Sequence, residues 1–183
     1  MAQDVTTRIS AIEDQIGKLE RELAALRREA HGEAVTDYDL TGWEGTVRLS
    51  ELFGDRDRLI VIHNMGFSCP YCTIWADGFN GLLPHLEERA AFALASPDPV
   101  EQQKKGAAKR GWKFRMVSTQ SSSFSRDMGF EDDGSPMPGV STFTRASDGT
   151  IRRHAAAPFG PGDRFCAVWS FVDLLPEATE AGR

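Results

Sequence analysis

The amino-acid sequence predicts an α/β fold with a mixed sheet, preceded by a long helix and a small hairpin. From residue 59 onward, short apolar runs alternate with amphipathic helical stretches, an order typical of βαβ units. Late in the chain, Ser147-Asp148-Gly149 separates two strand-like stretches and predicts a hairpin, which adds antiparallel strands. The first thirty residues follow a separate seven-residue period. We therefore expect an amphipathic helix over residues 1–32 and an α/β domain over residues 33–183.

The composition narrows the class of protein. The chain has 183 residues, of which 40% are hydrophobic and 26% charged, enough for one domain with its own core. The formal net charge of −6 disfavours a nucleic-acid partner, because phosphates repel an acidic protein. No apolar run reaches the roughly 18 residues that span a bilayer, and the polar start does not read as a secretory signal. We expect a cytoplasmic protein without nucleic-acid or membrane partners.

The first helix carries an apolar residue at alternating steps of four and three. These residues are Val5, Ile9, Ile12, Ile16, Leu19, Leu23 and Leu26. This is the a/d pattern of a coiled coil over about three and a half heptads, and Gly32 is a plausible end for the helix. The stripe predicts either a homodimer through residues 1–30 or a helix that lies along its own domain.

The next segment leads into a buried strand. Short alternating stretches around Gly42 and Gly45 predict a small hairpin. Ser50 is expected to cap a single helical turn that reaches Gly54. The continuous apolar run 59–62 suits a strand that is buried on both faces.

A helix is expected to begin just after Ser68, with Pro84 kinking or ending its regular part. Its apolar face would carry Cys72, Trp75, Ala76, Phe79, Leu82, Leu83 and Leu86. Residues 91–95 read as a strand, and residues 100–109 as a helix that stops at Gly111. These elements complete a strand–helix–strand–helix order.

The last third of the chain continues the alternation. Its expected elements are a strand at 114–118, a short helix at 124–128, an acidic loop at 131–138 and hairpin strands at 140–145 and 150–154. Asp163 is expected to cap a final helix that carries Phe165, Val168, Trp169 and Val172. The whole order is compatible with a thioredoxin-like three-layer sandwich and an N-terminal extension.

The feature that carries chemistry is Cys69-Pro70-Tyr71-Cys72, between a predicted buried strand and a helix N-terminus. The partial positive charge of a helix N-terminus favours a thiolate, so Cys69 is the expected nucleophile. Cys72 lies about one turn further on the same side and can resolve a mixed disulfide on Cys69. Pro70 suits the first helical turn, where its missing N–H is not needed. The motif predicts a redox-active dithiol that forms a reversible disulfide bond.

These cysteines have two other interpretations. Structural zinc needs four ligands, commonly with a second Cys or His pair, and Cys166 with four scattered histidines offers neither. No metal or cofactor is therefore expected. The pair could instead be inert and buried, which only its exposure decides. Cys166 stands among apolar residues and is expected to pack as one of them, with a resolving role as the lesser alternative.

Three residues near the motif are candidates for supporting roles. His63, six residues before Cys69, is either a general base for Cys72 or a core histidine with a hydrogen bond. Trp75 is expected in the core. Asp77 is either a surface charge or a proton partner near the site, with the surface position favoured.

Several segments together resemble a known family. They are Arg27-Arg28, Leu52-Phe53-Gly54, Cys69-Pro70-Tyr71-Cys72, Trp75-Ala76-Asp77, His85-Leu86, Gly111-Trp112-Lys113-Phe114 and Pro138-Gly139-Val140-Ser141-Thr142-Phe143. In these segments the chain resembles the bacterial thioredoxin-like proteins classed as predicted dithiol–disulfide oxidoreductases. That family is related to the alkyl hydroperoxide reductase and thiol-specific antioxidant branch and is largely of unknown function. The resemblance implies a thioredoxin fold and redox chemistry at the paired cysteines, without naming a substrate.

The sequence departs from this family and from better-known relatives. Glu29-Ala30-His31 stands where the family tends towards Leu-Pro. His63 stands where thioredoxins have a buried Asp, and Ser141 where they have a cis-proline, so substrate docking is expected to differ. Cys-Pro-Tyr-Cys is also the glutaredoxin motif, but the Thr-Val-Pro stretch that holds glutathione there is missing. Glutathione therefore remains one possible substrate among several.

The peroxidatic loop of peroxiredoxins, Pro-x-x-x-Thr-x-x-Cys, is absent. Counted back from Cys69, its Pro and Thr positions hold Ile62 and Gly66, and counted back from Cys72 they hold Met65 and Cys69 itself. A peroxiredoxin-like thiol peroxidase with an antioxidant role is therefore the second hypothesis. A third is a coiled-coil interaction module with a redox-sensing site.

The function that the sequence favours is a thiol–disulfide oxidoreductase acting on a protein or small-molecule disulfide or thiol. Cys69 would attack, Cys72 would resolve and His63 would serve as base. The residues expected beside them for docking or support are Pro70, Tyr71, Trp75, Asp77 and Ser141.

Overall fold

The structure is a computed structural model that describes residues 2–176, with side chains from residue 4. Its centre is an eight-stranded mixed sheet in the order β1-β10-β9-β4-β5-β6-β2-β3. The strands are β1 (Glu33–Ala34), β2 (Asp39–Gly42), β3 (Gly45–Arg48), β4 (Arg58–His63), β5 (Ala91–Ser96), β6 (Arg115–Ser118), β9 (Gly139–Arg145) and β10 (Ile151–Pro158). β4, β5 and β6 are mutually parallel, and β9 joins β4 antiparallel. The expected mixed α/β sheet is confirmed.

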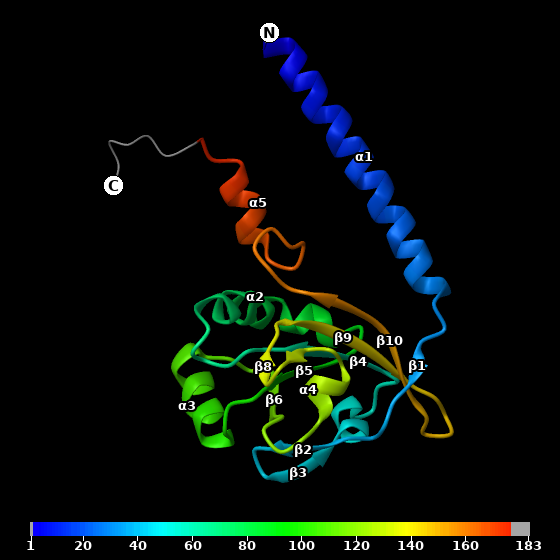
Figure 1. The fold of residues 1–183 in the computed structure, drawn as a ribbon, viewed down its shortest axis with the longest axis vertical. Helices are drawn as coiled ribbons and strands as arrows, with labels where there is room; N and C mark the ends of the chain where they lie inside the picture. Colours follow the sequence, from blue (N-terminus) through cyan, green and yellow to red (C-terminus); the bar gives the residue numbers. More distant parts are fainter. Residues whose placement is uncertain (1, 177–183) are drawn as a thin grey trace.

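Helical segments cover the two faces of the sheet (Figure 1). The helices are α1 (Ala2–Glu29), the 3-10 helix η1 (Leu49–Phe53), α2 (Pro70–Glu87), α3 (Val100–Arg110), α4 (Phe124–Asp127) and α5 (Ala167–Asp173). One core cluster joins α2 and α3 to one face, and a second joins η1 and α4 to the other. The result is three layers with β4, β5 and β9 at the centre.

The side chains of β4 alternate between these two clusters. Ile60 and Ile62 pack beneath α2, whereas Leu59 and Val61 belong to the cluster on the other face. Because successive side chains of a strand point to opposite faces, His63 lies on the same face of β4 as Leu59 and Val61. The last residue of β4 therefore faces away from α2.

The helix α2 follows β4 after a short loop and begins at the cysteine motif. Cys69 is its N-cap and Pro70 its first residue, as the sequence predicts. The helix continues through Pro84 to Glu87, so the expectation that Pro84 ends its regular part is wrong. The turn stays closed after Pro84, since Glu88 N–H donates to the Pro84 carbonyl at 3.2 Å.

The N-terminal helix α1 extends away from the body of the molecule, and α5 projects from the same end (Figure 1). The apolar stripe of α1 is largely uncovered, which differs from a helix lying along its own domain. The helix ends at Glu29, three residues before Gly32. Among residues 2–176, no helix is both long and apolar enough to cross a membrane.

Three local predictions need correction. Ser50 lies inside η1, and it donates to Asp37 instead of capping the turn. The loop 131–138 contains a small hairpin of β7 (Glu131–Asp132) and β8 (Ser135–Pro136). The last helix begins at Ala167, so Asp163 does not cap it and Phe165 precedes it.

Candidate functional site

Cys69 and Cys72 lie on the first turn of α2, at the carboxyl end of β4. The backbone N–H of Cys72 donates to Cys69 Sγ at 3.3 Å, so the first thiol occupies the capping position of the helix. That position supplies the sulfur with a hydrogen bond and with the partial positive charge of the helix end. Both thiols are free. The structure thus brings the two cysteines together at a helix N-terminus, the local geometry that their spacing predicts.

The two thiols differ in exposure. Cys69 is 9% exposed and Cys72 is 2% exposed. The pKa of Cys72 is raised to about 12, mainly by burial and also by neighbouring Cys69 and Asp98, whereas the hydrogen bond from the Met65 N–H lowers it. That N–H donates to Cys72 Sγ at 3.3 Å. Both cysteines are therefore buried, Cys69 less deeply than Cys72, and the raised pKa keeps Cys72 a protonated thiol near neutral pH.

A five-residue loop, residues 64–68, links β4 to the cysteine motif. Asn64 Nδ2 donates to the Cys72 carbonyl at 3.4 Å, and Asn64 Oδ1 accepts from Gly66 N–H at 2.8 Å. The N–H of Phe67 donates to Asp98 Oδ2 at 2.9 Å. The loop is therefore hydrogen-bonded both to Cys72 and to the segment that follows the neighbouring strand β5.

Asp98 is a buried carboxylate beside the site that the sequence reasoning missed. Its Oδ2 also accepts from Ser96 Oγ at 3.1 Å, and its Oδ1 accepts from Gln102 Nε2 at 3.0 Å. Gly66 has a φ of 97°, and a Cβ at that residue would lie 2.8 Å from Asp98 Oδ1. A signal was present in the sequence, because Asp98 closely follows the strand parallel to β4, and such strands end at one edge of the sheet.

His63 and Ser141 form a buried pair across β4 and β9. His63 Nε2 lies 3.0 Å from Ser141 Oγ, and the ring stacks on Phe130 with centroids 3.9 Å apart. Burial, and then the positive charge of Arg153, lowers the pKa of His63 to about 3. His63 is therefore a core histidine with a hydrogen bond, while its role as base for Cys72 stays a prediction. Within residues 4–176 no hydrogen bond joins it to either cysteine.

Ser141 is fully buried in the middle of β9. It is paired in register with Val61, on the sheet face opposite α2. No peptide bond in the described range is cis, so the strand passes this position as ordinary extended chain. Ser141 supports the strand that precedes the cysteines and does not present its side chain to a substrate from solvent.

The remaining predicted site residues lie on α2. Trp75 is buried, and its Nε1 donates to Asp163 Oδ2 at 3.0 Å. Asp77 accepts from Trp112 Nε1 at 2.7 Å and from Arg110 Nη2 at 3.0 Å. The exposed Asp77 thus links α2 to the end of α3 through hydrogen bonds and an ion pair.

Pro70 and Tyr71, the two residues between the cysteines, are exposed. The Tyr71 ring lies 6.3 Å from the Trp169 ring of α5, centroid to centroid. These two predicted docking residues directly follow Cys69 in the chain and are exposed.

Cys166 is buried in the cluster beneath α2, at the position just before α5. It therefore packs among apolar side chains, as the sequence predicts. Across the described chain, no three His, Cys, Asp or Glu side chains gather as a metal ion would require.

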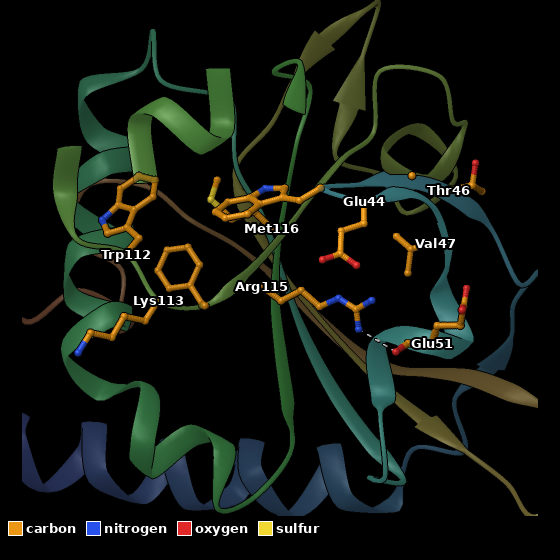
Figure 2. A pocket seen from close by; sticks show the side chains of 12 residues that line it. Glu44, Thr46, Val47, Glu51, Trp112, Lys113, Arg115 and Met116 are labelled. Carbon is orange, nitrogen blue, oxygen red and sulfur yellow. Dashed lines mark hydrogen bonds between the residues drawn. The ribbon is translucent and has the colours of Figure 1, made fainter. Parts of the chain in front are cut away.

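Two surface hollows lie away from the cysteine pair. Figure 2 shows one of about 550 Å³ between the β2–β3 turn and β6, into which Glu44 and Arg115 point; Arg115 donates to the Glu51 carbonyl at 2.8 Å. The other, about 490 Å³, is an apolar groove beside α2, β9 and β10 that Arg27 and Arg164 also line. Neither hollow is lined by Cys69 or Cys72.

Comparison with known sequences identifies one family. The family model described as "Bacterial protein of unknown function (DUF899)" matches residues 5–182. No curated protein matches the chain.

Comparison with solved structures finds proteins of similar fold. Peroxidoxin BcpB from Mycobacterium tuberculosis is 26% identical and superposes with a TM-score of 0.56 over 70% of this chain and 85% of its own. The bacterioferritin comigratory protein from Xanthomonas campestris is 22% identical, with a TM-score of 0.56 over 79% and 97%. Reduced Prx3 from Vibrio vulnificus, in complex with hydrogen peroxide, is 16% identical, with a TM-score of 0.60 over 80% and 99%. These likenesses confirm the thioredoxin-like fold that the sequence predicts.

Proposed function

The chain belongs to the DUF899 family of bacterial proteins of unknown function, and from its own site we propose that it is a thiol–disulfide oxidoreductase. Cys69 attacks the substrate and Cys72 resolves the intermediate. The substrate is a disulfide, or in the reverse direction a dithiol, on a protein or a small molecule such as glutathione.

The observation that carries this proposal is the asymmetry between two thiols one helical turn apart. Cys69 Sγ caps α2 and accepts an N–H bond at 3.3 Å, whereas Cys72 is almost fully buried. An attacking thiol needs access and a stabilised thiolate, and a resolving thiol needs only to reach the first sulfur. The geometry supports this division of roles, because Cys69 is the more exposed thiol and accepts an N–H bond at the helix start, while Cys72 lies on the same turn.

The reaction proceeds in two balanced steps. The Cys69 thiolate attacks one sulfur of the substrate disulfide, which breaks the S–S bond, forms a mixed disulfide and releases the other sulfur as a thiolate. Cys72, once deprotonated, attacks Cys69 Sγ and releases the second substrate thiolate. The substrate gains two electrons and the protein retains a Cys69–Cys72 disulfide. An external thiol reductant must reduce that disulfide to complete a cycle.

Proton transfer from Cys72 controls the second step, because burial holds its pKa at about 12. The first thiolate released by the substrate leaves beside Cys69 and is a suitable acceptor for this proton. The predicted base His63 would have to act across the sheet, since its side chain points to the face opposite α2. We propose that the leaving thiolate takes the proton and that His63 supports β9 through Ser141.

A thiol peroxidase is the second candidate, and one observation favours it: several structures of similar fold carry peroxiredoxin names. In that reaction Cys69 attacks a hydroperoxide, releases an alcohol or water and becomes a sulfenic acid. Cys72 then forms the same disulfide and releases water. The missing Pro-x-x-x-Thr-x-x-Cys loop argues against this reaction as the main one.

A redox titration in glutathione buffers tests the dithiol directly. Thiols are trapped by alkylation and the Cys69–Cys72 disulfide is followed by mass. We expect a two-electron transition between about −300 and −120 mV. The matched control is Cys166→Ser, which should leave the transition unchanged because Cys166 is buried in an apolar cluster that contains neither Cys69 nor Cys72. If no Cys69–Cys72 disulfide forms at any potential, the proposal is wrong.

Trapping separates the two candidate reactions. With a model disulfide, Cys72→Ser should accumulate a mixed disulfide on Cys69, whereas Cys69→Ser should accumulate none. The same Cys72→Ser protein is mixed with hydrogen peroxide and a sulfenic-acid probe. Rapid labelling of Cys69, together with little mixed disulfide, would make the peroxidase the better account.

A further inference from the structure

The N-terminal helix α1 carries an uncovered apolar stripe along its length. It has 28 residues and extends away from the body (Figure 1). Seven apolar residues at the a and d positions of α1 form its seam, and six of them are between 51% and 64% exposed. They are Val5, Ile9, Ile12, Ile16, Leu19 and Leu26. A helix gains most of its stability by packing an apolar face, which this one does not do within the described chain.

More apolar surface lies at the same end of the molecule. On α5 and just after it, five large side chains are exposed: Val168, Phe171, Val172, Leu174 and Leu175. The apolar groove of about 490 Å³ is lined by Arg27 of α1 and by Phe165, just before α5. Large exposed apolar patches on proteins commonly mark interaction sites. The end of the molecule that carries α1 and α5 has the character of an interface.

We propose that a second copy of this chain covers the surface, with the two α1 helices paired as a parallel, in-register coiled coil. The a positions of the stripe hold Ile9, Ile16 and Leu23, and the d positions hold Val5, Ile12, Leu19 and Leu26. Ile9 and Ile16 at a with Leu19 and Leu26 at d match the pattern that favours two parallel strands, whereas Ile12 at d does not, so the flanking charges decide the arrangement. Parallel pairing places the α/β domains of both chains at the same end of the coiled coil. The α5 helix and apolar groove of one chain then lie beside those of its partner.

The flanking charges select this orientation. In a parallel pair, each g residue faces the e residue five positions later in the partner. Arg8 at g then faces the partner's Glu13, and Glu22 at g faces the partner's Arg27. Both pairs are attractive, and each occurs twice by symmetry. The ion pair that α1 makes with its own body, at 3.5 Å, joins Glu20 to Arg164 and uses none of these four side chains.

An antiparallel pair over the same seam has poorer charge complementarity. Glu13 would then face the partner's Glu20, and two carboxylates would repel. The attraction that this arrangement offers, between Arg8 and the partner's Glu29 at the helix end, only offsets that repulsion. In the parallel register Glu20 instead faces the uncharged Gln15 of the partner. The charges therefore favour the parallel arrangement.

The mass of the full chain in solution tests the dimer. Light scattering after size-exclusion chromatography should give about twice the 20.2 kDa of one chain. Ile9→Lys with Ile16→Lys places four charges in the seam of a dimer and should give one chain mass. The matched control is Ser10→Lys with Gly17→Lys, one residue along on the outer face, which should stay dimeric. Circular dichroism and the Cys69–Cys72 titration check that each variant is folded.

Charge reversal tests the orientation without disturbing the seam. Arg8→Glu alone and Glu13→Arg alone should each raise the dimer dissociation constant several-fold, and the double variant should restore it. In a background with Ser at positions 69, 72 and 166, Ile12→Cys should form a disulfide between the two chains on oxidation, because a parallel register sets the two copies of this position side by side.

The proposal is overturned by a monomeric wild-type chain, or by a dimer that the seam lysines leave intact. It is also overturned by a dimer in which the double reversal does not restore affinity and Ile12→Cys does not cross-link.

Discussion

His63 Nε2 lies 3.0 Å from Ser141 Oγ, and this contact joins the neighbouring strands β4 and β9 on the face of the sheet opposite α2. The ring stacks against Phe130 and Phe124, with centroids 3.9 and 5.4 Å away. These neighbours offer a charged imidazole no carboxylate partner, and Arg153 adds a positive charge nearby. The pair therefore depends on a neutral histidine.

This neutral histidine makes stability depend on pH. The pKa of His63 is about 3 in the folded chain, below its ordinary value of 6.5, so the unfolded chain binds the extra proton first. The contribution of His63 to stability is complete above pH 6.5 and is lost as pH falls toward 3, by up to about 1.4 kcal/mol per pH unit. Urea unfolding at several pH values measures the slope. His63→Gln should have a shallower slope over the same range, and an equal slope in both proteins would contradict the assignment.

Asp98→Asn should make the buried thiol more acidic. The negative charge of Asp98 contributes to the raised pKa of Cys72, so its removal lowers that pKa. The measurement is the pH dependence of Cys72 alkylation, made in a Cys69→Ser, Cys166→Ser background. Asp77→Asn is the matched control, because Asp77 lies on the same helix as Cys72 but bonds to Trp112 and Arg110. A shift of the same size in both variants would show that Asp98 has no specific effect.

Gly66→Ala and Gly78→Ala should change stability in opposite directions. Gly66 has a φ of 97° and faces the Asp98 carboxylate, so alanine there is strained and should destabilise the fold by about 1–3 kcal/mol. Gly78 lies inside α2 with open space around it, so alanine should stabilise the fold by about 0.4–1 kcal/mol. Urea midpoints of the two variants give the comparison. A Gly66→Ala protein as stable as wild type would contradict the close packing of the loop on Asp98.

Asp163→Ala should destabilise the fold, because Asp163 accepts hydrogen bonds that hold the segment between β10 and α5. Asp163 accepts from Trp75 Nε1 at 3.0 Å, from Gly160 N–H at 2.9 Å and from Phe165 N–H at 2.7 Å. Removing it leaves the indole N–H of buried Trp75 unpaired, at a cost of roughly 1–3 kcal/mol. In a Trp75→Phe background the same substitution should cost less, because that donor is already gone. Equal costs in the two backgrounds would show that the indole bond does not contribute.

Much of the fold and the centre of the site can be predicted from the sequence because they depend on local chemistry. The run 59–62 forms a buried strand, Cys69 caps the following helix, and Gly111 ends α3 in a left-handed conformation. Each outcome follows from residues within a few positions of one another. Predictions of boundaries are less accurate where a side chain has a distant partner. Ser50 lies inside η1 and donates to the distant Asp37, and Asp163 lies before the last helix and accepts from the distant Trp75.

The sequence by itself determined the alternating strands and helices, the cysteine pair at a helix start and the heptad stripe of α1. Only the tertiary structure decided which side chains from distant parts of the chain lie near the cysteine loop and His63. Asp98 reaches Phe67 from 31 residues away, and Ser141 reaches His63 from 78 residues away. The physical reason is that hydrogen bonds and burial act over a few ångströms in space, while sequence periodicity reports only on neighbours along the chain. The parallel order of β4 and β5 brings Asp98 to the cysteine loop, and the alternation of side chains along β4 turns His63 to the opposite face.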